Sequence, residues 1–128
     1  DAAGIGGLLL GEGCAGLYNP KVVRSAMGSL FSVPVKNCFS LTEELALLKS
    51  SGYTVAAAAL GGEPFFQASL PEKTVLIIGN EGNGISRETL KQADITLTLP
   101  MRGGAQSLNA SIAAGIMIYS LCFNSGKK

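Results

Sequence analysis

Short apolar runs that end at glycine or proline alternate with segments of helical periodicity along this 128-residue chain. The runs have the length and composition of buried β-strands, and the segments between them repeat apolar residues at helical spacing. Such alternation favours a single α/β domain, residues 1–128, with a mainly parallel sheet flanked by helices. The expected strands are 5–10, 33–35, 53–60, 74–78 and 95–99, and the expected helices are 20–30, 41–48, 86–91 and 107–123.

Residues that commonly cap helices precede these segments. Asn19 is followed by a proline, Ser40 by a glutamate three residues later, and Ser86 can begin a short helix. The last segment, 107–123, is apolar around most of its circumference, and a helix of this kind has to be surrounded by protein. In the first helix, the side chains expected to face the core are Val23, Ala26, Met27 and Leu30.

Composition excludes several kinds of site. The chain has no histidine, which removes histidine acid–base catalysis and histidine metal ligands. Cys14, Cys38 and Cys122 form no CxxC pair, so we expect buried small side chains and neither a zinc site nor a disulfide framework. Ten basic against nine acidic residues argue neither for nor against nucleic acid, because a basic face can occur within a balanced total.

The two ends of the chain indicate where the protein is located in the cell. The longest apolar stretch, 112–123, is shorter than the roughly 18–20 residues of a membrane span. The chain begins at Asp1, with a composition typical of the end of a helix, and shows no signal peptide. We therefore expect part of a longer cytoplasmic protein.

Loops after Leu60, Ile78 and Leu99 follow expected strands, and ligands of parallel α/β sheets bind at the carboxyl ends of strands. The loop GNEGNG after Ile78 has three glycines, which permit positive φ and close approach of a ligand. Its spacing is neither GxGxxG nor that of a P-loop, and a plain tight turn explains the glycines about equally well. Glu81 is not needed for a turn, and it favours a functional site.

A second informative segment, residues 99–111, has the sequence LPMRGGAQSLNAS. It leads from a strand end through a loop into the last helix. Ser107 alone reads as an ordinary N-cap. Asn109 and Ser111, so close behind it, exceed what capping requires.

Together the two segments resemble motifs 2 and 3 of the SpoU (TrmH-type) family of RNA ribose methyltransferases, within the SPOUT class. The resemblance covers nearly the whole chain, including NPKVVRSAMG at 19–28. It implies a parallel α/β fold whose C-terminal helix passes through a loop and forms a deep trefoil knot, a feature almost absent from other proteins. It also implies S-adenosyl-L-methionine as cofactor, a homodimer paired through the knot region, no metal, and RNA as substrate, ribosomal RNA before transfer RNA.

The resemblance also assigns roles by position in the motifs. The residues it implies for catalysis are Glu81, Ser107 and Asn109. Those it implies for the cofactor pocket are Leu60, Gly61, Gly79, Leu99, Met101 and Leu108. Lys21 and Arg24 lie three apart on one helix face; a solvated face is the plain interpretation, and the resemblance implies contact with RNA phosphates.

One departure from the family pattern limits what this chain can do. Motif 1, which places an arginine and an asparagine beside the reaction site, normally ends just before the position of Asp1. Arg102 lies in the motif 3 loop and does not replace that arginine. We therefore expect no RNA methylation by residues 1–128 alone. Two alternatives stay open: a knotted module that holds cofactor or RNA without catalysis, and a different α/β enzyme whose glycine loop binds phosphates.

Overall fold

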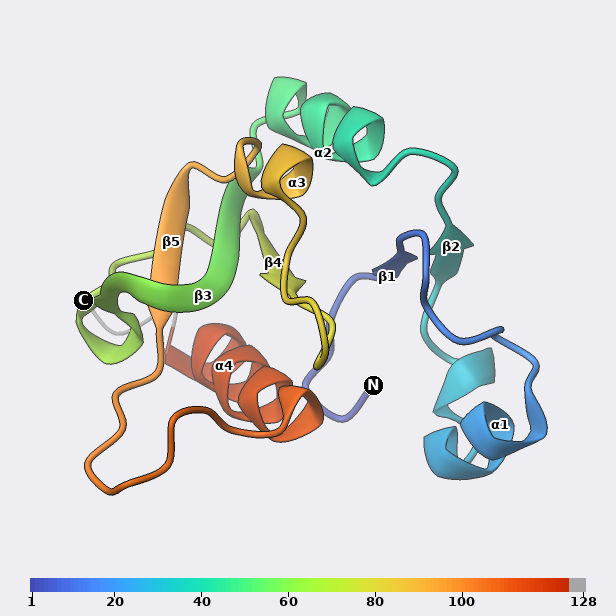
Figure 1. The fold of residues 1–128 in the computed structure, drawn as a ribbon. Helices are drawn as coiled ribbons and strands as arrows, with labels where there is room; N and C mark the ends of the chain where they lie inside the picture. The colour runs from blue at the N-terminus through green and yellow to red at the C-terminus, as the bar shows by residue number, and fades with distance from the viewer. Residues whose placement is uncertain (125–128) are drawn as a thin grey trace.

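Strands and helices alternate along the chain and form a parallel α/β fold in the computed structural model, which describes residues 1–124 (Figure 1). The class predicted from the sequence is confirmed. In chain order the elements are β1 (Leu8–Leu10), α1 (Pro20–Ala26), the 3₁₀ turn η1 (Ser29–Phe31), β2 (Val35–Asn37), α2 (Leu41–Ser50), β3 (Thr54–Pro64), the 3₁₀ turn η2 (Phe65–Gln67), β4 (Thr74–Ile78), α3 (Arg87–Leu90), β5 (Ile95–Thr98) and α4 (Ala110–Asn124).

The strands form two separate parallel sheets within the described residues. β1 pairs with β2, with Leu9 opposite Lys36. The larger sheet has the order β4-β3-β5, so β3 lies in the middle, and Ala56 faces Leu76 on one side and Ile95 on the other. The sequence predicted a strand near each of the five, but β1 is shorter than the expected 5–10 and β2 shares only Val35 with the expected 33–35. The division into two sheets was not predicted.

The core lies on both faces of β3, because successive side chains of a strand point to opposite faces. Val55 and Ala57 pack with Leu45 of α2 on one face. Ala56 packs with Leu97 of β5 and Met117 of α4 on the other. Figure 1 shows the same layers, with α2 and α3 on one side of the three-stranded sheet and α4 on the other.

The predicted caps are confirmed where a hydrogen bond defines them. Oδ1 of Asn19 accepts from the backbone N–H of Lys21 at 3.0 Å. Oγ of Ser40 accepts from the N–H of Glu43 at 3.3 Å, and Oγ of Ser86 accepts from the N–H of Thr89 at 3.2 Å. Each oxygen satisfies a backbone donor that the first turn of a helix leaves without a partner.

The first helix is shorter than the sequence predicted. It ends at Ala26, because Met27 adopts a left-handed conformation at φ 48° and Gly28 follows at φ 91°. The Met27 side chain is 90% exposed, so its assignment to the core was wrong.

The central strand is longer than predicted. β3 continues past Gly61 to Pro64, although the paired glycines were expected to end it. The register shifts between Ala58 and Glu63, both opposite Leu97, so the residues between them leave the ladder. Gly62 allows the strand to resume, because a Cβ there would lie 2.4 Å from the carbonyl oxygen of Thr96.

The last helix begins later and is less enclosed than predicted. It starts at Ala110 rather than near Ser107. Met117 is buried against the sheet, but one stripe of the helix faces outward. Its exposed large apolar side chains are Ile112, Ile116, Tyr119 and Phe123. The expectation that protein surrounds this helix is therefore wrong for the single chain.

Only one of the three cysteines is buried, contrary to expectation. Cys38 is buried, whereas Cys14 and Cys122 are exposed. Burial raises the pKa of the Cys38 thiol, because a low-dielectric environment disfavours the thiolate.

Among residues 1–124, none of the helices has the length and apolar character needed to cross a bilayer.

Asp94 joins α2, β3 and the turn before β5. Its Oδ2 accepts from the N–H of Val55 at 2.8 Å, and its Oδ1 lies 2.8 Å from Nζ of Lys49. The hydrogen bond from Lys49, and then that from Val55, lower the pKa of the Asp94 carboxyl. We expect Asp94→Asn to lower the free energy of unfolding at pH 7 by about 1 kcal/mol, since the pair is partly exposed and screened.

Because the pKa of Asp94 is lower in the folded state, its contribution is present above the unfolded value of about 3.9 and is lost as pH falls through the folded value. Urea unfolding from pH 7 towards pH 3 should therefore show the two proteins converging. Asp1→Asn at the exposed N-terminus is the control and should change little. A difference that persists unchanged at the lowest pH would contradict this account.

Candidate functional site

The carboxyl ends of β3, β4 and β5 lie at one edge of the larger sheet, because the three strands are parallel. The loop 80–84 follows β4, and the long loop 99–109 leads from β5 to α4. These are two of the loops singled out from the sequence. Their side chains decide whether this edge forms one site.

The loop after β4 is closed by its own hydrogen bonds. The N–H of Asn80 donates to the carbonyl of Gly84 at 3.0 Å, and the N–H of Gly84 donates back at 2.8 Å. Oδ1 of Asn80 also accepts from the N–H of Gly82 at 2.7 Å. The loop is therefore a compact turn that presents Glu81 outward, where the side chain is exposed.

Gly79 makes this compact turn possible. A Cβ at Gly79 would lie 2.7 Å from the carbonyl carbon of Gly84 and 2.9 Å from the nitrogen of Ile85. Both are backbone atoms, so a larger residue could not be accommodated by a change of rotamer. The close approach that the sequence suggested at this glycine is thus made to the chain itself.

Asn109 joins the two loops. Its Oδ1 accepts from the backbone N–H of Ser111 at 3.0 Å and from the Ser111 hydroxyl at 2.6 Å. Its Nδ2 is thereby left to donate to Oε1 of Glu81 at 2.5 Å. Since a backbone N–H can only donate, this network fixes which end of the amide faces the carboxylate.

Asn109 is also the cap of α4. Its carbonyl accepts from the N–H of Ala113 at 2.9 Å, and its side chain accepts from the N–H of Ser111. These are the bonds of an N-cap residue, so the sequence assigned the cap to the wrong residue when it chose Ser107. One side chain therefore ends the loop, begins the helix and holds Glu81.

The arrangement gives a carboxylate held on one side and open on the other. Within residues 1–124, no hydrogen bond to Oε2 of Glu81 is found. An oriented, exposed carboxylate can accept from a guanidinium, an amide or a hydroxyl group. The pair can thus position a cationic side chain or a polar ligand at this edge of the sheet.

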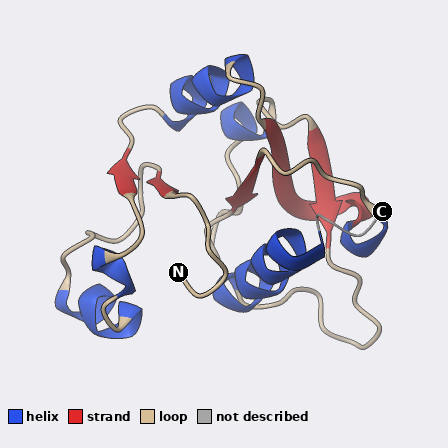
Figure 2. Cartoon of the chain, turned by 180° about the vertical axis from the view of Figure 1, so that it is seen from behind, coloured by secondary structure: helices blue, strands red, loops and turns tan. Residues whose placement is uncertain are grey.

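Two groups of predicted residues lie away from this pair. Ser107 is exposed in the loop before α4 and is not brought to Glu81 by a hydrogen bond in the described residues. Lys21 and Arg24 are exposed on α1, which lies at the other end of the molecule from the larger sheet (Figures 1 and 2). Within this chain, the helix that carries Lys21 and Arg24 therefore does not lie next to the Glu81–Asn109 pair.

The residues predicted for the cofactor lie along the same sheet edge. Leu60 and Gly61 belong to the segment that leaves the β3 ladder, and Gly61 has a φ of 77°. Leu99 and Met101 follow β5, the partner of β3, and are partly buried. Leu108 precedes Asn109 and is 38% exposed, while Leu60 is 77% exposed. The large cavity of the chain is elsewhere; of the six predicted cofactor residues only Gly79 borders it.

Two residues that shape the site were given no role from the sequence, although Ser111 had been noted beside Asn109. Asn80 folds the turn beneath Glu81, and Ser111 orients the amide of Asn109. Both have a recognisable sequence signal: an asparagine two residues before a glycine, and a serine two residues after an asparagine at a helix start. In the part of the chain that the structure describes, no group of three histidine, cysteine, aspartate or glutamate side chains could hold a metal ion.

The chain is similar to the same kind of protein whether sequences or structures are compared. A family model described as the SpoU rRNA Methylase family matches residues 1–119. The chain is 41% identical over 124 residues to a 23S rRNA (guanosine(2553)-2′-O)-methyltransferase, RlmP, of Bacillus subtilis (strain 168), covering 94% of this chain and 49% of the relative. It is 35% identical over 125 residues to a 23S rRNA (uridine(2479)-2′-O)-methyltransferase of Streptomyces viridochromogenes, covering 93% and 44%.

Solved structures resemble the chain over nearly its whole length. The SpoU methyltransferase AviRb from Streptomyces viridochromogenes, in complex with the cofactor AdoMet, superimposes with a TM-score of 0.86 at 32% identity, covering 96% of this chain and 51% of that one. A TrmH/SpoU tRNA modifying enzyme of A. aeolicus gives a TM-score of 0.77 at 31% identity, covering 94% and 62%. The chain spans about half the length of the curated relatives it matches.

Proposed function

Because this chain belongs to the SpoU rRNA methylase family, we propose that it is the cofactor-binding part of an enzyme that methylates the ribose 2′-hydroxyl of RNA. The observation that carries the proposal is the hydrogen bond between Glu81 and Asn109, which joins the two motif loops at the sheet edge. Ribosomal RNA is the proposed substrate, since several relatives are 23S rRNA 2′-O-methyltransferases. Transfer RNA is the alternative, suggested by the solved tRNA-modifying relatives.

The residues at the sheet edge fit S-adenosyl-L-methionine. Leu60 and Leu108 offer exposed apolar surface for an adenine ring, and partly buried Leu99 and Met101 lie on the same edge. Gly61 carries no side chain, so its backbone groups can approach a ligand closely. The bound cofactor supplies the activated methyl group. The chain has to hold it in line with the ribose oxygen, because alignment is the main catalytic requirement.

Glu81 and Asn109 serve this alignment as positioning residues. Asn109 holds Oε1 of Glu81, so Oε2 faces outward to accept from a basic side chain or a substrate hydroxyl. In the family that basic side chain is the arginine of motif 1. Ser107 would orient the loop around it. Arg102 does not take its place, because it lies in the loop between β5 and α4 and not at the position of motif 1.

Labelled methyl transfer tests the proposal. The full-length protein and residues 1–128 are each incubated with ribosomal RNA, transfer RNA and labelled S-adenosyl-L-methionine. We expect the full-length protein to label RNA at a ribose 2′ position and residues 1–128 to label none, because the motif 1 arginine is absent. Labelling of a base, or labelling by residues 1–128, would contradict the proposal; cofactor binding without transfer by the full-length protein would favour the non-catalytic module.

Calorimetric titration distinguishes the proposed function from the remaining alternative, an enzyme whose glycine loop binds phosphates. The N–H groups of Asn80, Gly82 and Gly84 already donate within the loop, so they are not free to hold a phosphate. We therefore expect S-adenosylhomocysteine to bind and ATP not to bind. Tighter binding of ATP would favour the alternative.

Lys21 and Arg24 are proposed to contact RNA phosphates from α1. Both side chains are exposed, and each cation that neutralises a phosphate releases a counterion. In the full-length protein, Lys21→Ala with Arg24→Ala should weaken RNA binding and reduce the salt slope by about 2. Filter binding between 50 and 200 mM salt measures this. Lys91→Ala, which also removes an exposed cation, is the control, and an unchanged slope in the double variant would count against the contact.

We propose a homodimer formed through α4. Its outward side chains recur at the spacing of a helical stripe, and Tyr119 stacks on Phe123 with ring centroids 5.4 Å apart. A contiguous apolar stripe of this kind is typical of an interface. Ile116→Glu in the full-length protein should convert a dimer to a monomer in analytical ultracentrifugation, while Leu47→Glu, on exposed surface of α2, should not. A dimer that survives Ile116→Glu would place the interface elsewhere.

The C-terminal trefoil knot and a cytoplasmic location complete the proposal. The support for the knot is the match to the family over most of the chain and the likeness in fold to SpoU methyltransferases. The support for the location is the RNA substrate, which is a cytoplasmic molecule in bacteria. Very slow refolding after long denaturation, when the knot has been lost, would be expected of a knotted chain.

A further inference from the structure

The segment around α1 combines exposed aromatic rings with exposed cations. Tyr18 lies just before the N-cap of α1, and Phe31 ends the 3₁₀ turn η1 that follows the helix. The Tyr18 side chain is 74% exposed and the Phe31 side chain 78%. Lys21 and Arg24 lie on the helix between them and are exposed as well. A single apolar side chain on a surface is ordinary, but two aromatic rings on either side of a cation pair point to a ligand.

Local structure holds these four side chains in one short lobe, residues 18–31. Lys21 and Arg24 are three residues apart in α1, so they share one face of the helix. The helix ends where the N–H of left-handed Met27 donates to the carbonyl of Arg24 at 3.3 Å. The turn η1, which carries Phe31, then packs next to α1 (Figures 1 and 2). The second ring therefore stays close to the cations along the chain and in space.

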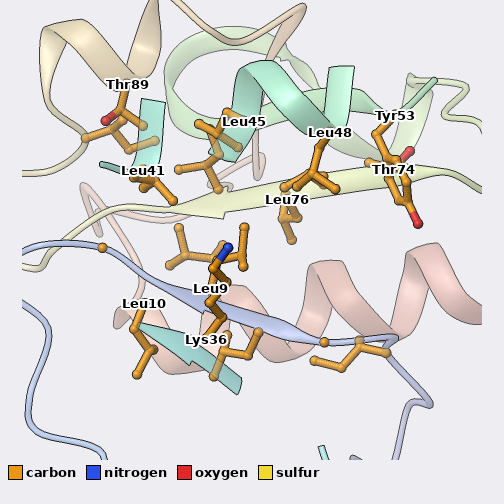
Figure 3. Close-up of a pocket in the computed structure, with 18 of the residues that line it drawn as sticks. Leu9, Leu10, Lys36, Leu41, Leu45, Leu48, Tyr53, Thr74, Leu76 and Thr89 are labelled. Carbon is orange, nitrogen blue, oxygen red and sulfur yellow. The ribbon is translucent and has the colours of Figure 1, made fainter. Parts of the chain in front are cut away.

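The charge around this lobe is positive. Residues 13–42 include no aspartate or glutamate. Their third cation, Lys36, borders the groove between β1 and β4, and its Nζ lies 2.6 Å from a carboxylate oxygen of Glu44 (Figure 3). Within residues 1–124, neither Lys21 nor Arg24 has such an ion pair. The positive charge of the lobe is thus available to an anion from outside the chain.

The donors of the two cations are also largely free. Nε of Arg24 donates to the carbonyl of Pro20 at 3.4 Å, which leaves the terminal N–H groups of the guanidinium for a ligand. In the part of the chain that the structure describes, no hydrogen bond from the ammonium of Lys21 is found. Guanidinium and ammonium groups in this state bind phosphate oxygens well.

We infer that this lobe binds unpaired nucleotides of the RNA substrate, with bases stacked on Tyr18 and Phe31 and phosphates held by Lys21 and Arg24. The inference rests on the proposed function and names the part of the RNA that the lobe takes. Cations that follow the backbone, combined with aromatic rings that stack on bases, are the means by which proteins hold single strands. In a duplex the base faces cover one another, so only unpaired bases can use the rings.

Charge favours RNA over the other possible occupants of the lobe. A second copy that docked through the same surface would bring two pairs of cations together, and residues 13–42 contain no carboxylate to offset them. Protein chain that covered both rings would also cover Lys21 and Arg24, and such side chains are rarely buried without a partner. RNA covers the rings and supplies the missing negative charge.

The position of the lobe indicates which nucleotides it binds. α1 lies at the end of the molecule away from the larger sheet, whose edge carries the pair of Glu81 and Asn109 (Figure 2). The nucleotides stacked on Tyr18 and Phe31 are therefore neighbours of the modified nucleotide along the RNA, not the modified nucleotide itself. The favoured substrate has an unpaired region that extends beyond the modified ribose.

Filter binding of the full-length protein to two RNAs tests the inference. One is a hairpin with a loop of unpaired adenosines, and the other is a blunt duplex with the same number of phosphates. Tyr18→Ala with Phe31→Ala should weaken binding of the hairpin at least about 25-fold, which is about fivefold for each base that loses its ring. Affinity for the duplex should stay the same. The salt slope should also stay the same, because stacking releases no counterions.

Two control variants accompany the double alanine variant. Tyr18→Phe with Phe31→Tyr keeps both rings and should bind the hairpin as tightly as the unmodified protein does. Leu47→Ala removes an exposed apolar side chain from α2 and should also leave binding unchanged. Photo-cross-linking of the unmodified protein gives a measurement that does not depend on the folding of any variant. A thiouridine in the hairpin loop should link to Tyr18 or Phe31, and one in the duplex should link to neither.

Several results would overturn the inference. Equal loss of affinity for both RNAs, or a smaller salt slope, would mean that the rings act only through the cations of α1. Unchanged hairpin affinity with a lower melting temperature would mean that the rest of the protein covers the rings. A change in sedimentation would mean that a second copy does so, and a hairpin that cross-links elsewhere would also refute it. If the protein methylates RNA while the double variant binds the hairpin normally, this inference fails and the proposed function stands.

Discussion

Glu81→Gln in the full-length protein is expected to lower the rate of RNA methyl transfer by about 100-fold, with little change in stability or in cofactor affinity. The glutamine keeps an oxygen for the hydrogen bond from Asn109, so the two loops stay joined. It loses the negative charge that would hold the motif 1 arginine through Oε2. Misplacing a catalytic group by about 1 Å can cost about 100-fold in rate, which sets the expected size. Single-turnover transfer of a labelled methyl group measures it.

Two further variants separate charge from position. Glu43→Gln removes a carboxylate from the exposed first turn of α2 and should leave transfer unchanged. Asn109→Ala keeps the charge of Glu81 but removes its hydrogen-bond donor and the cap of α4, so both rate and thermal stability should fall. If Glu81→Gln transfers methyl groups at the original rate, the carboxylate has no part in alignment and the assignment of Glu81 is wrong.

Gly79→Ala is expected to destabilise the fold and to distort the turn that carries Glu81. The new Cβ would lie 2.7 Å from the carbonyl carbon of Gly84, and only movement of the backbone could relieve the contact. We expect a loss of about 2 kcal/mol in the free energy of unfolding, within the range for overpacking. Because the turn that carries Glu81 has to open, affinity for S-adenosylhomocysteine should fall at least 10-fold. Chemical denaturation and calorimetry measure the two effects.

Gly103→Ala is the matched control for Gly79→Ala. It adds the same group to another glycine in a strand-end loop, but nothing lies within 4 Å of the new Cβ and the residue has no positive φ. Stability and cofactor binding should stay the same or improve slightly. If both variants behave alike, the packing of Gly79 on Gly84 does not shape the site.

The sequence was sufficient for the local features of the fold. The strand Thr74–Ile78 and the caps at Asn19, Ser40 and Ser86 are all where their patterns predict. A cap depends on a side chain and a backbone N–H two or three residues away, so the information lies within one short segment. The α/β class follows from the order of such segments, and the family follows from two motifs that each occupy one loop.

Some errors came from local rules that contacts between distant residues override. The glycine pair at 61–62 was expected to end a strand, yet Gly62 lets β3 resume against the backbone of Thr96. Ser107 was a reasonable cap for the last helix, but Asn109 has that position because it also holds Glu81, 28 residues away. In both cases the deciding neighbour is far along the chain, where periodicity and propensity carry no information.

The tertiary structure alone decided how the pieces assemble. Sequence periodicity showed that α4 is apolar all round, but only the packing of Met117 shows which side faces the sheet and which stripe stays outward. It also predicted one parallel sheet, whereas residues 1–124 form two, separated by the groove between β1 and β4. The physical reason is that hydrophobic pattern specifies which side chains must be buried, while the partner that buries them is fixed only when the backbone edges and faces of distant segments meet in space.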